Sequence, residues 1–191
     1  MSFIERNTNV VMERATLADI PLYGLPQGFT LRWYETGAEV AWLQIQSAAD
    51  QHNNITSDLF LKTFGSEQTA HEQRICFLTT ATGAPIGTAA AWWSEEGVEG
   101  RRGRIHWVAI LPAFQGRGLA KPLLTAVCLR LRELGHTSAY LTTSAARIPA
   151  LNLYGKFGFT PVIRDEMDRA VWQEIELYLR SGRLGPNVVG D

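Results

Sequence analysis

The segment from Gln115 to Ala120 places two glycines just before an amphipathic helix. Gly116 and Gly118 permit tight turning and close backbone approach to a ligand. The first amide groups of a helix lack internal partners and lie at the positive end of its dipole, so they can bind phosphate oxygens. A simple crossover loop explains the same glycines. The sequence of the segment matches neither a Walker loop nor the three-glycine dinucleotide fingerprint.

A second pattern with chemical potential lies further along the chain and contains Tyr154. It reads Ala150-Leu151-Asn152-Leu153-Tyr154-Gly155-Lys156-Phe157-Gly158-Phe159. A tyrosine phenol donates one hydrogen bond and can protonate a leaving group. Taken alone, the sequence favours the other interpretation of Tyr154, an aromatic ring packed in a helix that covers a sheet.

Together the two patterns resemble the GNAT superfamily of acetyl-CoA-dependent N-acetyltransferases. Gln-x-x-Gly-x-Ala, with Pro112 and Phe114 upstream, is similar to the pyrophosphate-binding motif of that family, and the segment around Tyr154 is similar to a later helix motif. The resemblance covers residues 74–159 well and the first half loosely. It implies an acyltransferase that moves an acetyl group from acetyl-CoA, as co-substrate, to a primary amine of a small molecule or protein by direct attack on the thioester.

The resemblance also implies a role for each matching position. The backbone of Val108, Ala109 and Ile110 would pair with the pantetheine arm like an added strand, and the amide of Val108 or Ala109 would polarise the thioester carbonyl. Tyr154 would act as general acid toward the coenzyme thiolate. The other coenzyme-binding candidates are Gln115, Gly116, Arg117, Gly118, Leu119, Ala120, Lys121, Arg147 and Asn152. Surface positions on helices are the alternative for Asn152 and Lys156, and a solvated arginine is the alternative for Arg117.

The general base is not fixed by either pattern. Ribosomal-protein acetyltransferases of this family carry a glutamate where this chain has Thr142, which argues against that subfamily. His106, with an ordinary pKa of about 6.5, is the catalytic candidate for taking the amine proton directly or through water, and a structural histidine is its alternative. Glu95, Glu96 and Glu99 are candidates for binding a cationic amine, or are simply solvated. Trp92, Trp93 and Trp107 either line the acceptor site or fill the core.

These candidates require a sheet with helices around it. The predicted strands cover residues 29–34, 74–80, 86–93, 104–110, 138–143 and 159–163. The predicted helices cover residues 38–49, 57–64, 119–134, 149–157 and 168–179. The strands before and after helix 119–134 form one right-handed crossover with parallel pairing. The predicted fold class is α/β (α+β by some schemes): a GNAT-like mixed, twisted central sheet of about six to seven strands with a parallel splayed pair, flanked by helices on both faces.

The chain is expected to hold one domain of this kind. Residues 1–28 show no sustained period and end in a turn cluster, which predicts an N-terminal arm. Residues 29–180 are the predicted acyltransferase domain, and residues 181–191 are a C-terminal tail.

Composition limits the other function classes. Eighteen Lys and Arg against nineteen Asp and Glu give a formal charge of −1, which provides no field for steering onto nucleic acid or membrane. Cys76 and Cys128 have no paired spacing, so we expect no disulfide framework and no metal site, and a reducing cytoplasm fits. We also expect no membrane span and a monomer or homodimer. The alternatives kept open are a non-catalytic acyl-CoA-binding regulatory module and an interaction protein that pairs through its hairpin and terminal helix.

Overall fold

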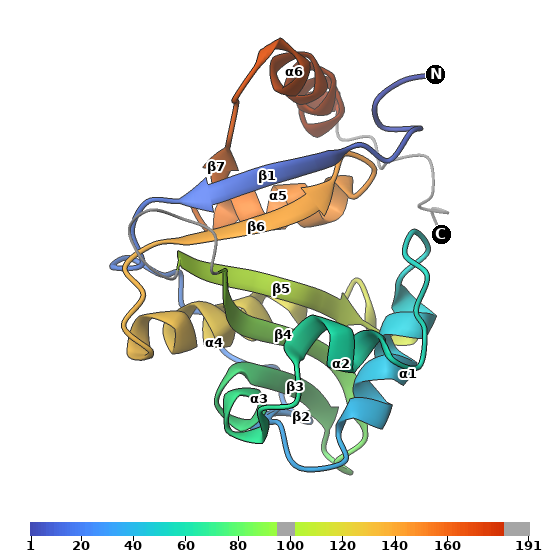
Figure 1. Ribbon diagram of the computed structural model, residues 1–191, viewed down its shortest axis with the longest axis vertical. Coiled ribbons are helices and arrows are strands. Elements are labelled where there is room, and N and C mark those ends of the chain that lie inside the picture. The colour runs from blue at the N-terminus through green and yellow to red at the C-terminus, as the bar shows by residue number, and fades with distance from the viewer. Residues whose placement is uncertain (95–101, 182–191) are drawn as a thin grey trace. The chain divides into compact units, whose positions relative to one another are not determined.

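The computed structural model describes residues 1–94 and 102–181 (Figure 1). Glu95, Glu96 and Glu99 lie outside the described residues, as do positions 182–191 of the predicted tail. The chain divides into two compact units. One is continuous, Leu17–Thr137, and the other combines Met1–Thr16 with Ser138–Asp191.

The continuous unit contains an antiparallel sheet in the order β2-β3-β4-β5. Its strands are β2 (Phe29–Trp33), β3 (Ile75–Thr80), β4 (Pro85–Ser94) and β5 (Arg102–Ile110). Its helices are α1 (Glu39–Ala49), α2 (Leu59–Phe64), α3 (Gln68–Arg74) and α4 (Ala120–Glu133), with a 3₁₀ turn at Pro112–Phe114. The predicted hairpin of β3 and β4 is confirmed, and α3 is an additional short helix.

The two inner strands β3 and β4 are buried on both faces of this sheet, and their buried residues are mostly apolar. The first five residues of β3 are all buried, and side chains alternate between faces along a strand. Ile75 and Phe77 join an aromatic cluster with Trp42 of α1 and the phenylalanines of α2. Helix α4 packs against β3, β4 and β5. Its buried apolar residues include Leu123, Leu124, Val127 and Leu131.

The second unit contains a smaller antiparallel sheet in which β1 (Asn9–Arg14) lies between β6 (Ala139–Ser144) and β7 (Thr160–Pro161) (Figure 1). Helices α5 (Ile148–Lys156) and α6 (Glu166–Ser181) belong to the same unit. Strand β1 was not predicted, and it lies within the N-terminal arm expected over residues 1–28. Its pattern is short and ends in two charged residues, and Arg14 is nevertheless buried because its guanidinium donates to the Phe157 carbonyl at the end of α5. The strand predicted over residues 159–163 is reduced to two residues.

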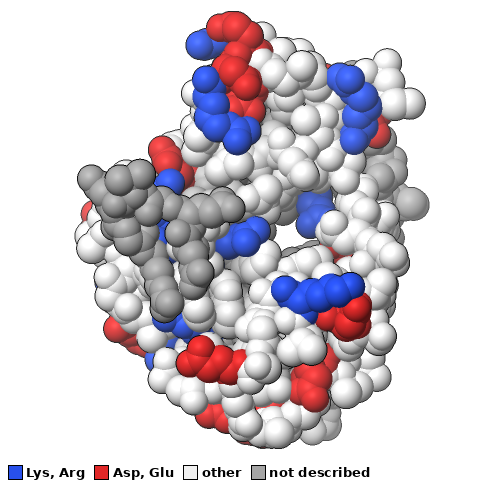
Figure 2. Space-filling view, in the orientation of Figure 1, with Lys and Arg blue, Asp and Glu red and all other residues white. Residues whose placement is uncertain are grey.

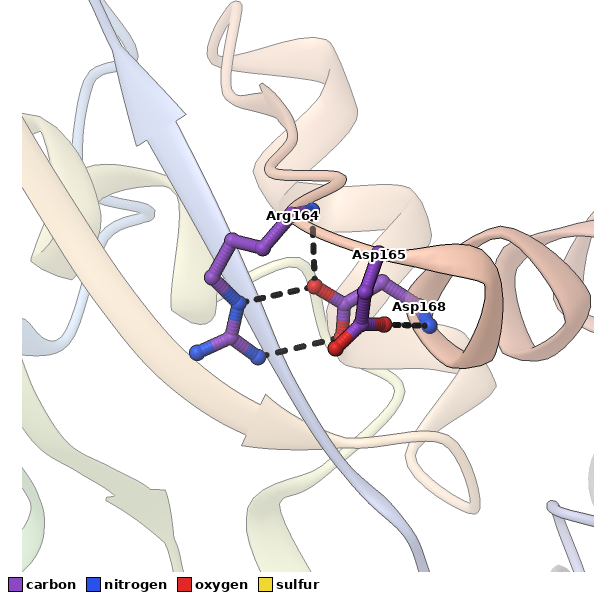
Figure 3. A network of polar contacts seen from close by, with 3 residues as sticks. All are labelled: Arg164, Asp165 and Asp168. Atoms are coloured by element: carbon purple, nitrogen blue, oxygen red, sulfur yellow. Dashed lines mark hydrogen bonds and ion pairs between the residues drawn. The ribbon is translucent and has the colours of Figure 1, made fainter.

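Helix α6 begins at a small polar network of Arg164, Asp165 and Asp168 (Figure 3). The Asp165 carboxylate accepts a hydrogen bond of 2.8 Å from the Asp168 amide, as an N-terminal cap does. The Arg164 Nε donates to an oxygen of Asp168 at 2.7 Å and Nη2 donates to the other at 3.0 Å. This contact with Arg164 lowers the pKa of Asp168 to about 2. The cap starts the helix two residues before the predicted start at residue 168.

Candidate functional site

Strand β5 carries an irregularity at the positions expected to meet the coenzyme. The register pairs Ala90 with His106 but Thr88 with Ala109, so Trp107 and Val108 together face one residue of β4. Two residues opposite one define a β-bulge. Trp107 adopts a left-handed backbone conformation with φ of 49°, which is uncommon for a bulky residue.

The bulge determines which backbone groups of β5 point away from β4. The Leu111 amide donates to the Ile86 carbonyl at 2.8 Å. Antiparallel bonding alternates along a strand, so Ala109 faces β4 while Val108 and Ile110 face the opposite edge. Of the three residues expected to pair with pantetheine, Val108 and Ile110 therefore have the required direction.

The loop after β5 presents a run of amide groups, here called the cradle, which spans Gly116 to Ala120. Within residues 1–94 and 102–181, no group of the protein accepts a hydrogen bond from any of these five amides. Gly116 and Gly118 have φ of 72° and 75°, in the left-handed region that favours glycine. A Cβ added at either glycine would meet nothing within 4 Å, so backbone conformation rather than crowding requires glycine. In the described part of the chain, these amides are available to a ligand.

Residues on either side hold the cradle in place. The Gln115 amide donates to the Pro112 carbonyl at 3.1 Å, and its side-chain Nε2 donates to the Ile110 carbonyl at 2.9 Å. Gln115 thus fastens the loop to the end of β5 and offers no amide of its own. Leu119 is 1% exposed, so its side chain anchors the start of α4 while its amide remains unpaired within the described chain.

The two cations beside the cradle rest on aromatic rings. The Arg117 guanidinium lies 5.1 Å from the centre of the Phe114 ring, and the Lys121 Nζ lies 5.1 Å from that of Tyr23. Both contacts are within cation–π range. Arg117 is exposed and Lys121 half-buried. Either cation is close enough in sequence to accompany a phosphate bound at the cradle.

His106 lies half-buried on β5 beside the aromatic cluster. Its ring is 5.9 Å from the ring of Phe64 and 5.9 Å from that of Trp107. Burial, with a smaller contribution from the positive charge of Arg104, lowers the pKa of His106 to about 3. The imidazole is therefore neutral at pH 7 and holds an added proton weakly.

The three tryptophans divide between core and partial exposure. Trp92 is buried and stacks on Trp93 with ring centres 4.4 Å apart. The Arg74 guanidinium covers the Trp93 ring at 4.4 Å. Trp107 packs edge to face on Trp42 of α1 at 5.3 Å. Core packing accounts for most of this aromatic area.

The other candidates lie on or just before α5 in the second unit. Tyr154 is 7% exposed and its ring packs edge to face on Phe159 at 6.2 Å. Arg147 precedes the first residue of α5, and its amide donates to the Ser144 carbonyl at 3.1 Å. Asn152 and Lys156 are exposed on the helix.

Two buried polar residues that the sequence analysis did not single out support these elements. Arg14 donates to the Phe157 carbonyl at the end of α5. Gln46 of α1 donates from Nε2 to the Trp107 carbonyl at 3.0 Å. A glutamine between apolar helix positions was the available signal for Gln46, but its partner is distant in sequence.

In Figure 2, Lys and Arg form small groups interspersed with Asp and Glu on the face shown.

Cys76 and Cys128 are free thiols and both are buried. Burial raises the pKa of the Cys76 thiol to about 12. No helix in the described residues is both long and apolar enough to cross a bilayer.

Comparison with known proteins gives a consistent result. The family model described as acetyltransferase (GNAT) family matches residues 31–159. A mycothiol acetyltransferase of Streptomyces bingchenggensis is 34% identical over 159 residues, covering 81% of this chain and 50% of the relative. A mycothiol acetyltransferase of Nocardia farcinica is 31% identical, covering 74% of this chain and 48% of the relative. The chain thus spans about half the length of these curated relatives.

Solved structures agree with that result. A GCN5-related N-acetyltransferase from Sphaerobacter thermophilus has a TM-score of 0.66 and 25% identity, covering 81% of this chain and 48% of that one. An aminoglycoside N-acetyltransferase in complex with CoA has a TM-score of 0.56 and 19% identity, and the match covers 74% of this chain and 95% of that one. The chain belongs to the GNAT acetyltransferase family. The resemblance seen in the sequence and the predicted fold class, a mixed sheet flanked by helices, are both confirmed.

Proposed function

We propose that this chain is an N-acetyltransferase that binds acetyl-CoA and transfers the acetyl group to a primary amine. The observation that supports this most strongly is the cradle. Five consecutive amides, Gly116 to Ala120, have no acceptor among the described residues and lie at the start of α4. Such a run suits a diphosphate, whose oxygens accept several hydrogen bonds near a helix N-terminus. Arg117 and Lys121 would add positive charge there.

The backbone of strand β5 would bind the pantetheine arm and the thioester of the coenzyme. The backbone of Ile110 faces the edge away from β4 and would pair with the pantetheine arm. The Val108 amide faces the same edge, beside the bulge, and would donate to the thioester carbonyl. A fixed donor at that point stabilises the negative charge that develops on the oxygen when the amine attacks.

Two proton movements accompany the transfer. Tyr154 would donate its phenol proton to the departing thiolate. The attacking amine must be neutral and loses a proton as the new amide forms. His106, neutral at pH 7 because of its low pKa, would accept a hydrogen bond from the amine or from a water molecule that carries the proton to solvent. Because its pKa is about 3, His106 would not retain that proton at neutral pH and is a weak general base.

The acceptor proposed for the first test is the amine used by the mycothiol acetyltransferases, because those relatives reach 34% identity. Amino sugars, amino acids, polyamines and protein N-termini complete the panel. We also propose a reducing cytoplasmic setting, in keeping with the free thiols of Cys76 and Cys128. A monomer or homodimer is proposed, without nucleic acid or membrane partners.

The test is thiol release from acetyl-CoA across this amine panel, with coenzyme binding measured separately by calorimetry. Turnover with one amine class supports the enzyme. Coenzyme binding without turnover on any amine supports a non-catalytic acyl-CoA-binding module instead. The Tyr154→Phe variant should keep coenzyme affinity and lose turnover by about a hundredfold or more if the phenol is the acid. Unchanged turnover would remove that role from Tyr154.

A further inference from the structure

Gln46 is a buried polar side chain on α1 and is 1% exposed. Trp42 and Ile45 on the same helix are buried as well, and α1 contacts β4 and β5. A buried side-chain amide needs a hydrogen-bond partner, because removing it from water unpaired costs free energy. Its Nε2 donates to the main-chain carbonyl of Trp107 at 3.0 Å.

The carbonyl that Gln46 holds belongs to the most unusual residue of β5. Trp107 has a φ of 49°, and only one other non-glycine residue in the described chain, Asn7, has a positive φ. A bulky residue persists in this conformation where its surroundings enforce it. Here the surroundings come from one helix. The Trp107 ring packs on Trp42 at 5.3 Å, and its carbonyl bonds to Gln46, one helical turn further along α1.

The bulge held in this way sets the direction of the next residue. Trp107 and Val108 together oppose Ala89, between the pairs Ala90 with His106 and Thr88 with Ala109. If β5 ran without the bulge, one residue fewer would separate these two pairs. The backbone groups of β5 on one side of that point would then face the other edge of the strand. The bulge is therefore what gives the Val108 amide its direction away from β4.

We infer that Gln46 is a positioning residue for acyl transfer, which fixes the Trp107 carbonyl and thereby aims the Val108 amide at the thioester carbonyl. This inference rests on the proposed function, which assigns Val108 the task of polarising that carbonyl. Gln46 does not touch the substrate in this scheme. We expect its contribution in turnover rather than in coenzyme binding, because Gln46 bonds to Trp107 within β5, whereas the cradle follows the end of β5.

The decisive variants alter the donor at position 46 while preserving volume. Gln46→Met removes the donor and keeps a similar length of chain. Gln46→Glu replaces the amide by a carboxyl group, which donates to the Trp107 carbonyl only when protonated. Gln44 lies on the exposed face of the same helix, so Gln44→Met and Gln44→Glu are the matched controls.

For Gln46→Met we expect kcat to fall by at least about tenfold, short of the loss of about a hundredfold to a thousandfold seen when an oxyanion-hole donor is removed outright. The dissociation constant of CoA should stay within about threefold of the original, since the hydrogen bond of Gln46 is made to Trp107, outside the cradle. The backbone amide resonance of Val108 should shift in the free protein. Both Gln44 variants should match the original chain in all three measurements.

For Gln46→Glu we expect activity, divided by that of the original chain at the same pH, to rise as the pH falls and the new carboxyl group is protonated. A residue that only fills space would give a flat ratio, as Gln44→Glu should. This ratio also decides the question if Gln46→Met does not fold.

Three results would each overturn the inference: an unchanged kcat for Gln46→Met, a fall in kcat matched by an equal loss of CoA affinity, or a flat pH ratio for Gln46→Glu. The proposed function fails separately, when the original chain releases no thiol with any amine. In that case the Val108 resonance of Gln46→Met still reports whether Gln46 holds the bulge.

Discussion

Replacing Gly118 by alanine tests whether the cradle depends on backbone conformation. Gly118 has a φ of 75°, and a Cβ there would meet nothing within 4 Å. The expected cost is therefore conformational, about 1–2 kcal/mol for a non-glycine residue in the left-handed region. No steric clash adds to it.

This cost must appear either in stability or in coenzyme affinity. If the loop keeps its shape, the melting temperature falls by about 2–8 °C, at about 2–4 °C per kcal/mol for a chain of this size. If the loop relaxes until coenzyme restores its shape, the dissociation constant of CoA rises by about 5-fold to 30-fold. Thermal unfolding and calorimetry on the same sample measure both quantities.

The series needs a graded variant and a control. Gly118→Asn should lose less than Gly118→Ala, because asparagine tolerates the left-handed region better. Gly155→Ala is the control, since Gly155 lies within α5 with no positive φ and no neighbour within 4 Å of an added Cβ. That control should be neutral or stabilising by about 0.5–1 kcal/mol. Wild-type stability together with wild-type CoA affinity in Gly118→Ala would refute the reasoning.

Three further predictions follow from the structure. Gly87→Ala should destabilise the chain by about 1–3 kcal/mol, because the new Cβ would lie 3.0 Å from the Ala109 carbonyl oxygen; an unchanged urea midpoint would contradict this. His106 should stay neutral in an NMR titration down to about pH 4, and a titration midpoint near pH 6 would exclude the low pKa. The free energy of unfolding should fall as the pH drops from about 6.5 toward 3, because in that range the imidazole binds a proton only in the unfolded chain. Asp168→Asn should lower the free energy of unfolding by its full amount above about pH 4 and by less as the pH falls to about 2, because contact with Arg164 lowers the pKa of Asp168. Urea unfolding of both chains across this range measures the loss, and a loss that does not change with pH would disprove the role of the charge.

The sequence predicted the parts of the fold whose signals are local. The apolar stripe of α4, the turn between β3 and β4, and the glycines of the cradle each follow from spacing within a few residues. The family resemblance then gave the order of these parts. The predicted run of free amides began at Gln115, whose amide is bonded to the Pro112 carbonyl, and the binding of coenzyme at the remaining amides stays a prediction.

The features that were missed depend on distant contacts. Strand β1 has one unusual feature, a buried arginine, whose guanidinium donates to the nearby Thr16 carbonyl and to the Phe157 carbonyl far along the chain. The bulge at Trp107 carries no glycine to mark it, because α1 holds the tryptophan in a conformation that its own preferences disfavour. The low pKa of His106 likewise arises from burial that the sequence does not specify.

The pairing of β1 with β6 has a consequence for synthesis. Residue 9 pairs with residue 144, so β1 waits for this partner strand until the residues between them have been translated. Meanwhile Leu17–Thr137 is a continuous unit whose own strands pair with one another. We expect that unit to fold first, with β1 held as an unpaired edge that a chaperone or a nearby β6 must cover. Slow, late closure of β1 is thus built into the order of the sequence.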